Sequence, residues 1–297
     1  MLEALLGVGG QPVWGKKASL TPRQSTDAVT INGKLYVFGG AGVSAVPLGD
    51  LNCYTPETDT WELKAPGPPA RKDAAMGVVD GKLYIHGGYN ASLGGVLSDV
   101  WCYDPADDTW AAKGNGPSPR TGAAGVGIEG HFFVLAGYAN NNWDKTLWAY
   151  RVSTNQWIQL TSLPGVARQM HSLVEVGGKL YCYSGFAATG GLNDFWCYDR
   201  TSNRWTQLVP HASGTSRYLY AASALGGKLY IHGGWDTVGA LNELLCYDPL
   251  TAAWTKLKTA HVLYDHFAAT INNKLYVGGG ARPNASVSGD LWEIPLA

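Results

Sequence analysis

The sequence predicts an all-β protein made of six copies of one four-stranded unit, and three observations lead to this prediction. A short apolar run that ends in a glycine pair, or in a close variant of it, recurs six times at intervals of 46–49 residues. A tyrosine followed seven residues later by a tryptophan recurs five times in step with that run. Helical periodicity of useful length is absent from the sequence, and turn-forming residues separate the short runs.

The first two strands of each unit are expected to form a tight hairpin. The apolar run is the second strand, and its six copies are Leu35–Gly40, Leu83–Gly88, Phe132–Gly137, Leu180–Gly185, Leu229–Gly234 and Leu275–Gly280. A two-residue turn precedes each copy, at Asn32-Gly33, Asp80-Gly81, Glu129-Gly130, Gly177-Gly178, Gly226-Gly227 and Asn272-Asn273. Such pairs are typical of primed hairpin turns, which need a positive φ at their central residues.

The third and fourth strands are expected to carry the aromatic pair, with a short polar turn between them. The pairs are Tyr54 and Trp61, Tyr103 and Trp110, Tyr150 and Trp157, Tyr198 and Trp205, and Tyr247 and Trp254. Because these tryptophans repeat in register with the units, we interpret them as packing residues between neighbouring units.

The order of hydrophobic run, glycine pair, tyrosine and tryptophan resembles the kelch-repeat family over residues 12–294. The resemblance implies a six-bladed β-propeller, with four antiparallel strands per blade around a central channel. We expect residues 1–297 to form this single domain. The expected blades are approximately 23–64, 71–113, 120–160, 168–208, 217–257, and 263–294 together with 12–17.

The two ends of the chain are expected to close the ring. The sixth glycine pair is followed by Asp290–Ile294, which corresponds to a third strand, but no fourth strand follows. Pro12–Lys17, which contains Trp14, looks like an outer strand that has lost its own blade. We therefore predict that the N-terminal strand completes the sixth blade, which removes exposed sheet edges.

The charge pattern limits the partners that the sequence predicts. There are 22 basic and 23 acidic residues without a run of like charge, so neither nucleic acid nor a membrane surface is an expected partner. The first residues, MLEALLGVGG, do not resemble a signal peptide, and we expect a cytoplasmic monomer. No cofactor and no metal site are predicted.

The cysteines are interpreted as buried structural residues. Cys53, Cys102, Cys197 and Cys246 each precede the tyrosine of a different unit, so they are too far apart to form disulfides. They are expected to act as small hydrophobic residues in a reducing compartment. Cys182 lies within an apolar run without an evident partner, and we do not expect it to act as a nucleophile.

Candidate site residues are expected where the first strand of each blade begins. Sixteen residues before each glycine pair the chain has Arg23, Arg71, Arg120, Arg168 and Arg217, here called the leading arginines, and Leu263 in the sixth unit. We expect them to be structural and to bridge neighbouring blades. The resemblance implies that the residues just after these positions, and the residue after each glycine pair, line a ligand pocket. The expected ligand-binding residues are Tyr89, Tyr138, Phe186, Trp235, Asp73, Tyr264 and Arg217.

Two classes of function remain open from the sequence. The aromatic residues favour a binding module for a peptide, a protein, or a small neutral to cationic molecule. The alternative is a cofactor-independent isomerase, cyclase or lyase that acts on a small metabolite. For that case the expected acid–base residues are His266, kept charged or oriented by Asp265, with His171 or Tyr220 as its counterpart. His171 and His266 can also be read as structural histidines.

Overall fold

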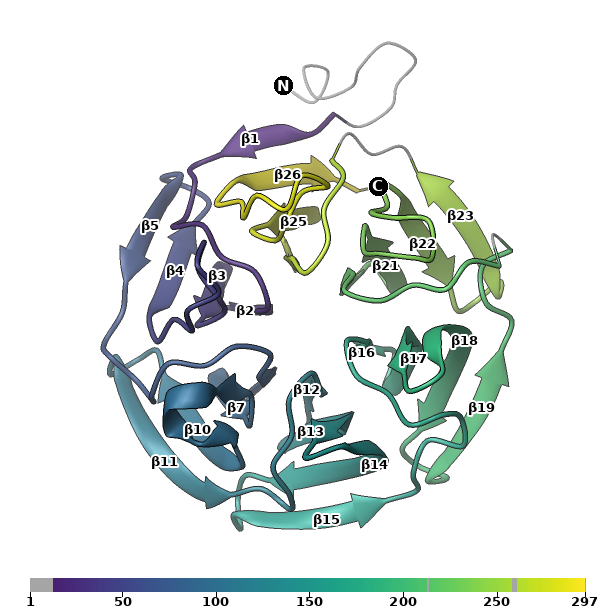
Figure 1. Cartoon of the computed structure of the whole chain (residues 1–297), viewed down its shortest axis with the longest axis horizontal. Helices are drawn as coiled ribbons and strands as arrows, with labels where there is room; N and C mark the ends of the chain where they lie inside the picture. The colour runs from purple at the N-terminus through teal and green to yellow at the C-terminus, as the bar shows by residue number, and fades with distance from the viewer. Residues whose placement is uncertain (1–12, 213, 258–260, 297) are drawn as a thin grey trace.

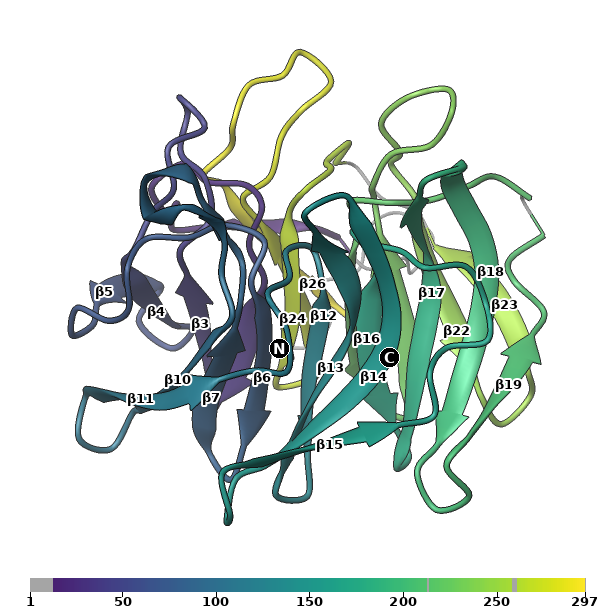
Figure 2. The ribbon, with the colours of Figure 1, turned by 60° about the horizontal axis from the view of Figure 1, so that its bottom comes forward.

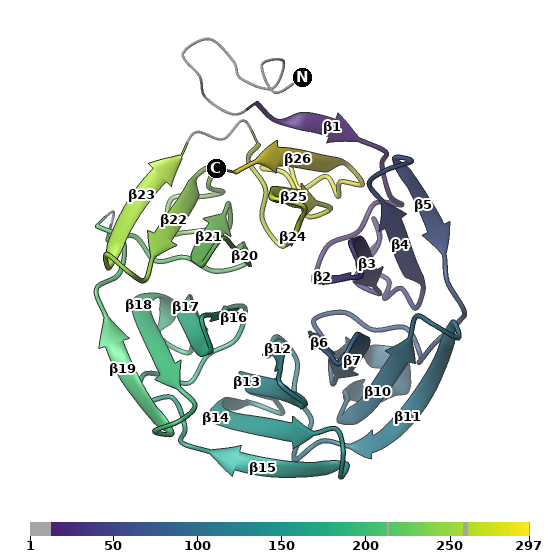
Figure 3. The same cartoon turned by 180° about the vertical axis from the view of Figure 1, so that it is seen from behind.

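Six four-stranded sheets form a closed ring around a central channel (Figures 1 and 3). The structure is a computed structural model that describes residues 13–212, 214–257 and 261–296. Every pair of neighbouring strands within a sheet is antiparallel, and the innermost strand of each sheet borders the channel. The predicted six-bladed propeller is therefore confirmed.

Each blade takes its strands in chain order, from the channel outward. Blade 1 contains β2 (Ala28–Ile31), β3 (Lys34–Phe38), β4 (Leu51–Thr55) and β5 (Thr60–Leu63). Blade 2 contains β6 (Ala75–Val79), β7 (Lys82–His86), β10 (Asp99–Asp104) and β11 (Thr109–Asn115). Blade 3 contains β12 (Ala124–Ile128), β13 (His131–Ala139), β14 (Asn142–Arg151) and β15 (Gln156–Leu160).

The second half of the chain repeats this arrangement. Blade 4 contains β16 (Ser172–Val176), β17 (Lys179–Ala187), β18 (Gly190–Asp199) and β19 (Arg204–Leu208). Blade 5 contains β20 (Ala221–Leu225), β21 (Lys228–His232), β22 (Leu244–Asp248) and β23 (Ala253–Leu257). Blade 6 contains β24 (Phe267–Ile271), β25 (Lys274–Gly278), β26 (Leu291–Pro295) and, as its outermost strand, β1 (Gly15–Lys17).

The loops between the second and third strands of the blades all lie on one face of the ring, called the top face below. Antiparallel order brings the start of each first strand to the same face. In Figure 2 the yellow loop between β25 and β26 stands clear of the strands on this side. In blade 2 this connection holds the short pair β8 (Tyr89–Asn90) and β9 (Gly95–Val96) around the 3-10 turn η2 (Ala91–Leu93). The opposite face carries the two-residue hairpin turns, and both residues of each have positive φ as predicted.

The predicted closure of the ring is confirmed by the pairing of β1 with β26. Gly15 lies opposite Glu293 and Lys17 lies opposite Leu291 in an antiparallel register. Pro12, the first residue of the predicted strand, lies outside the described residues. Trp14 packs against the cluster between blades 5 and 6. The strand therefore joins the beginning of the described chain to its end by both hydrogen bonds and apolar contacts.

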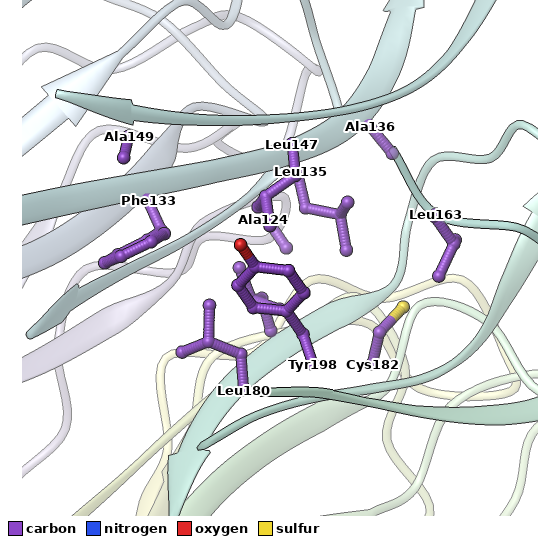
Figure 4. Close-up of a cluster of buried hydrophobic side chains, with 11 residues drawn as sticks. Ala124, Phe133, Leu135, Ala136, Leu147, Ala149, Leu163, Leu180, Cys182 and Tyr198 are labelled. Carbon is purple, nitrogen blue, oxygen red and sulfur yellow. The ribbon is translucent and has the colours of Figure 1, made fainter. Parts of the chain in front are cut away.

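The hydrophobic core is divided into six clusters, and each lies between two neighbouring blades. Figure 4 shows the cluster between blades 3 and 4, where Phe133 and Leu147 face Leu180, Cys182 and Tyr198. Each repeated tryptophan packs at the cluster that joins its blade to the preceding one, as predicted. All five cysteines are buried and free of disulfides. Burial raises the pKa of the Cys182 thiol to about 12, so it stays protonated.

The leading arginines hold each blade together through an ion pair that is largely buried. Arg71, for example, donates two hydrogen bonds to Asp99, at 2.6 and 2.8 Å, and one to the carbonyl of Gly87 at 3.0 Å. The ion pairs are Arg23–Asp50, Arg71–Asp99, Arg120–Asp144, Arg168–Asp194 and Arg217–Glu243. Both partners of each ion pair belong to the same blade. The prediction that the leading arginines bridge neighbouring blades is therefore wrong for their guanidinium groups.

The backbone at the same position does connect neighbouring blades. The carbonyl of Arg71 accepts a hydrogen bond from the Gly40 amide of blade 1 at 2.9 Å, and the other five blades repeat this bond. A side chain at Gly39 would place its Cβ only 2.5 Å from that same carbonyl. In this blade the glycine therefore allows a close approach to the next blade, whereas blades 3 and 4 have Ala136 and Ser184 at the same position.

In blade 6, Leu263 stands in place of the leading arginine, and cations from other positions pair with the equivalent carboxylate. The equivalent carboxylate, Asp290, forms ion pairs with Lys16 at 2.9 Å and with Arg282 at 2.5 Å. Lys16 belongs to β1, so the strand that closes the ring also neutralises this acid. Leu263 itself is buried in the cluster between blades 5 and 6.

Candidate functional site

The mouth of the channel on the top face is framed by a closed ring of six backbone hydrogen bonds. One residue of each blade takes part, just before the first strand: Ser25, Asp73, Gly122, Met170, Leu219 and Asp265, here called the mouth ring. Each amide donates to the carbonyl of the corresponding residue in the preceding blade, at 2.7–3.3 Å. All six residues have φ between 54° and 62°. Only one is glycine, so the hydrogen bonds offset the steric cost of this conformation at the other five.

Two cavities meet inside this ring. The larger, of about 360 Å³, lies in the channel between the first strands of the six blades. The smaller, of about 60 Å³, lies at the mouth and is lined by all six mouth-ring residues. Asp27, His171 and Tyr220 line both cavities, so the two are continuous. Any group that enters from the top face reaches these three side chains after it passes the mouth ring.

Three carboxylates gather at the mouth. Asp73 and Asp265 stand on either side of Ser25 in the mouth ring, Asp27 lies just before β2, and all three residues line the small cavity. Asp265 accepts a hydrogen bond from the Ser25 hydroxyl at 2.6 Å. The one cation paired with this group is Lys72, whose Nζ lies 3.8 Å from the Asp73 carboxylate. Asp27 was not predicted, because it directly follows the two positions that were compared between the repeats.

Burial and mutual repulsion keep these carboxyl groups partly protonated near neutral pH. Burial, with the negative charge of Asp265 second, raises the pKa of Asp73 to about 7. Desolvation by the surrounding protein, with the charge of Asp265 second, raises the pKa of Asp27 to about 6, although Asp27 itself is exposed. Burial also raises the pKa of Asp265, although its hydrogen bond from Ser25 favours the charged form. The mouth thus holds acids that can gain or lose protons between pH 6 and 7.

The two candidate histidines lie at the mouth and are neutral. His171 is 9% exposed and His266 is 3% exposed. Burial lowers the pKa of each to about 3, and the charge of Arg168 adds to the effect on His171. Among the described residues neither ring nitrogen of His171 has a hydrogen-bond partner, and neither does Nδ1 of His266.

The expected pairing of His266 with Asp265 is wrong. Nε2 of His266 lies 2.9 Å from Nδ1 of His232 on β21, so the imidazole points to blade 5. Asp265 instead bonds to Ser25 on the other side, in blade 1. The positive φ of Asp265 explains the difference, because it turns the carboxylate away from the next residue along the chain. In blades 1 to 5 the leading arginine pairs with an acid near the start of the third strand and not with the mouth-ring residue. Its replacement by Leu263 in blade 6 therefore does not affect Asp265.

Tyr220 lines both cavities, but its hydroxyl is already engaged. The phenol donates to the carbonyl of Tyr183 and accepts a hydrogen bond from the Ser172 amide at 3.0 Å. Burial raises its pKa. Arg217 lines neither cavity, because its guanidinium is buried and bonded to Glu243 and to the Gly233 carbonyl. We therefore leave Arg217 out of the candidate site.

Aromatic side chains form an arc on the top face over blades 3 to 6, made of one group of four rings in contact and one separate pair. The residue after each glycine pair is bridged through its backbone to the residue just before the mouth ring, which places its backbone next to that ring. The aromatic side chains themselves line neither cavity. The aromatic arc consists of Tyr138, Trp143, Phe186, Tyr218, Trp235 and Tyr264, all of them half-buried. Its ring centroids lie 4.8–6.1 Å apart in the pairs Tyr138–Trp143, Trp143–Phe186, Phe186–Tyr218 and Trp235–Tyr264.

Two members of the arc, Trp143 and Tyr218, were not predicted from the sequence. Trp143 begins the returning strand of the β13–β14 hairpin and lies opposite Tyr138. Tyr218 directly follows the leading arginine of blade 5, one position before those that were compared between repeats. Tyr89, which was predicted, lies outside the arc in blade 2, where the Lys72 ammonium is 5.8 Å from its ring centroid. A longer comparison of the repeat positions around each arginine would have found Tyr218.

The residue types at the site limit the ligands and reactions that it can support. Within 13–212, 214–257 and 261–296, no group of three or more His, Cys, Asp or Glu side chains is arranged to hold a metal ion. Over the same ranges, no helix is long and apolar enough to cross a membrane. The site therefore offers carboxyl groups, neutral imidazoles and aromatic faces.

Comparison with known proteins agrees with the fold. The sequence profile of the KLHDC2/KLHL20/DRC7 Kelch-repeats domain matches residues 12–163, 68–216 and 111–280. Kelch-like ECH-associated protein 1A of Danio rerio is 37% identical over 84 residues, which cover 27% of this chain and 14% of that protein. Kelch-like protein 35 of Mus musculus is 33% identical over 76 residues, or 25% of this chain and 13% of that protein.

A curated relative with an enzyme name also matches. N-acetylneuraminate epimerase of Shigella flexneri is 34% identical over 77 residues, which cover 24% of this chain and 21% of the epimerase. The matched segments thus span between about an eighth and a fifth of the lengths of these relatives.

Proposed function

Because the chain belongs to the family of kelch-repeat domains, we propose that it is a binding module that holds a peptide segment of a partner protein at the top face. The observation that carries the proposal is the aromatic arc beside the mouth. Half-buried rings offer large contact areas with little loss of side-chain entropy, and such residues dominate the energetics of protein interfaces. The proposed ligand-binding residues are Tyr89, Tyr138, Phe186, Trp235, Tyr264 and Asp73.

The proposal is tested with a phage-displayed library of random peptides selected on the wild-type protein. We expect the selected peptides to lose at least tenfold in affinity for the double variant Trp235→Ala/Tyr138→Ala. Leu250→Ala is the matched control, because Leu250 is 94% exposed in a turn on the opposite face. Thermal unfolding of each variant monitors stability. Equal affinity of the double variant and the control for these peptides, or failure to select any peptide, contradicts the proposal.

A second candidate is a cofactor-independent isomerase, cyclase or lyase, and the raised pKa values at the mouth favour it. A carboxyl group whose pKa is near 7 can both donate and accept a proton at neutral pH. In this candidate function Asp73 acts beside Asp265, with His171 and Tyr220 on the facing wall and His266 as a neutral neighbour. The similarity to N-acetylneuraminate epimerases suggests the first substrate to test.

The enzymatic candidate is tested by adding the protein to N-acetylneuraminate and following epimerisation by NMR. We expect a rate above the spontaneous one that falls at least a hundredfold in Asp73→Asn, the usual weight of a general acid–base group. A wild-type rate equal to the spontaneous rate rules out N-acetylneuraminate as the substrate. An unchanged rate in Asp73→Asn rules out Asp73 as the acid–base residue.

We further propose that the protein works as a monomer in a reducing compartment such as the cytoplasm. All five cysteines are buried without a disulfide, which suits such a compartment. Closure of the ring by β1 completes the four strands of blade 6 and leaves sheet edges only at the channel and at the outer rim, so no blade depends on a second copy of the chain. Sedimentation analysis measures the oligomeric state directly.

A further inference from the structure

We propose that the mouth of the channel binds a primary ammonium group on an aliphatic chain, held between Asp73, Asp265 and Asp27 while the aromatic arc contacts the rest of the ligand. A lysine side chain of a peptide and a free alkylamine share this chemistry. The inference rests on the proposed binding function, because it names the group that the same pocket selects.

The first argument is the balance of charge at the mouth. Three carboxylates line the small cavity, and Lys72 is the single cation paired with them among the described residues. The leading arginines are unavailable to the mouth, since each is buried and bonded to an acid of its own blade. The mouth therefore carries an excess of negative charge that a cationic ligand can neutralise.

The second argument is a surplus of hydrogen-bond acceptors. No group among the described residues donates a hydrogen bond to the carboxylate of Asp27. Among the same residues, the carboxylate of Asp265 accepts one from a single hydroxyl, that of Ser25. His171 and His266 line the same cavity, are more than nine-tenths buried, and have ring nitrogens without partners. These nitrogens are covered by the protein, so the carboxylates are the acceptors that a ligand at the mouth meets. An ammonium brings three donors and no acceptor, which matches this environment.

The third argument is size and composition. A cavity of about 60 Å³ has room for a small head group but not for a ring system. A quaternary ammonium has no N–H to donate, and a guanidinium is a wider, planar group. A metal ion is also a poor match, because no group of the described His, Cys, Asp and Glu residues is arranged to hold one. The aromatic arc next to the cavity suits the aliphatic chain that carries an ammonium.

The proposed interaction is linked to proton release. The groups that face Asp73 are Asp27, Asp265, Lys72 and the neutral rings of His171 and His266. Burial and the charge of Asp265 raise the pKa of Asp73 to about 7, and a bound cation favours its ionised form. Affinity for an ammonium is therefore expected to rise as the pH increases from 5 to 7 and then to level off.

The test uses two probes that differ only in the ammonium, Nα-acetyl-lysine N-methylamide and Nα-acetyl-norleucine N-methylamide, with n-butylammonium as the free alkylamine. Binding is measured by NMR titration at low ionic strength. At pH 7.5 we expect the lysine probe to bind at least tenfold more tightly than the norleucine probe. We expect its affinity to fall at least tenfold in Asp73→Asn/Asp265→Asn and at pH 5. Comparison with n-butylammonium distinguishes a peptide side chain from a free amine as the preferred source.

Asp107→Asn is the matched control, because Asp107 is exposed in a turn on the opposite face. Asparagine tolerates the positive φ of Asp73 and Asp265, so the double variant keeps the backbone conformation of the mouth ring. Equal affinities for the lysine and norleucine probes overturn the inference, as does an unchanged affinity in the double variant. Displacement of the lysine probe by calcium at a lower concentration than the probe itself overturns it in favour of a metal site.

The same experiment separates this inference from the proposed function. Peptides selected from the library that lose affinity in Trp235→Ala/Tyr138→Ala but not in Asp73→Asn/Asp265→Asn support the binding module and overturn the ammonium site. Lysine probes that bind and respond to the aspartate variants, when the library yields no peptide, support the ammonium site and contradict peptide binding.

Discussion

His266 shows at the scale of one residue how the tertiary environment changes the meaning of a sequence signal. An imidazole beside an aspartate in the sequence suggested a charged acid–base group. In the fold the two side chains diverge, and burial lowers the pKa of His266 to about 3. Its contact at 2.9 Å is with His232, in the neighbouring blade. The residue thus links blade 6 to blade 5 and also lines the mouth.

We predict that His266→Ala lowers the free energy of unfolding by about 1–3 kcal/mol, because it leaves His232 without this partner and opens a small cavity. Urea denaturation measures the change. Unaltered stability together with a large loss of activity on any substrate found for the protein would show instead that His266 acts in proton transfer.

Asp73 allows a prediction with a defined sign. Its pKa is raised from the usual 3.8 to about 7 in the fold. Between these values the folded state binds more protons than the unfolded chain, so this group makes stability fall as the pH rises from 4 to 7. The carboxylate therefore destabilises the empty protein at neutral pH, as functional groups often do.

We predict that Asp73→Asn raises the free energy of unfolding by about 1–3 kcal/mol at pH 7.5 and changes it little at pH 4. Chemical denaturation at the two pH values tests this, with Asp107→Asn as the control. A loss of stability at pH 7.5 would mean that Lys72 stabilises the charged carboxylate more than burial and Asp265 destabilise it.

At the scale of the blade, the ion pair of the leading arginine is the repeated polar element. It joins the start of the first strand to the start of the third and also satisfies a carbonyl near the glycine pair. Removal of one partner leaves the other charge in a largely buried place without compensation. Such losses cost much more than the loss of an exposed pair.

We predict that Arg71→Ala destabilises the protein by about 3–5 kcal/mol. Arg282→Ala is the comparison, because Arg282 pairs with Asp290 but its side chain is 46% exposed. We expect it to cost less than about 1 kcal/mol. Equal effects in thermal unfolding would show that burial does not set the strength of these pairs.

At the scale of the whole molecule, closure of the ring depends on three residues of β1. Their pairing with β26 is reinforced by Lys16, which neutralises Asp290, and by Trp14, which packs between blades 5 and 6. A break at this point exposes the edge of β26 and the cluster beside it.

We predict that deletion of residues 1–17 lowers the Tm by about 10 °C or more, or causes aggregation. Deletion of residues 1–12 is the control, since it keeps β1. If the two deletions have the same effect, the loss does not come from β1. If neither changes the Tm, the closure contributes little to stability.

The sequence by itself was sufficient to predict the six repeats, the four strands of each blade, the primed turns and the closing strand. These features depend on local preferences and on a pattern that returns about every 48 residues, such as Asn32-Gly33 before Leu35. Tyr138, Phe186 and Trp235 of the aromatic arc could also be predicted, because they follow the glycine pairs. Trp143 was missed because it lies in the connection whose length varies between the repeats, and Tyr218 was missed because it lies one position before those that were compared.

Only the tertiary structure decided which polar groups meet. Asp73 and Asp265 are separated by 192 positions in the sequence but only by Ser25 in the mouth ring, and the backbone hydrogen bonds of that ring leave no signal in its side chains. The same is true of His266 with His232 and of Asp290 with Lys16. Contacts between blades depend on ring closure and on burial. Both also set the pKa values of the residues at the mouth. No short stretch of the chain encodes either of them.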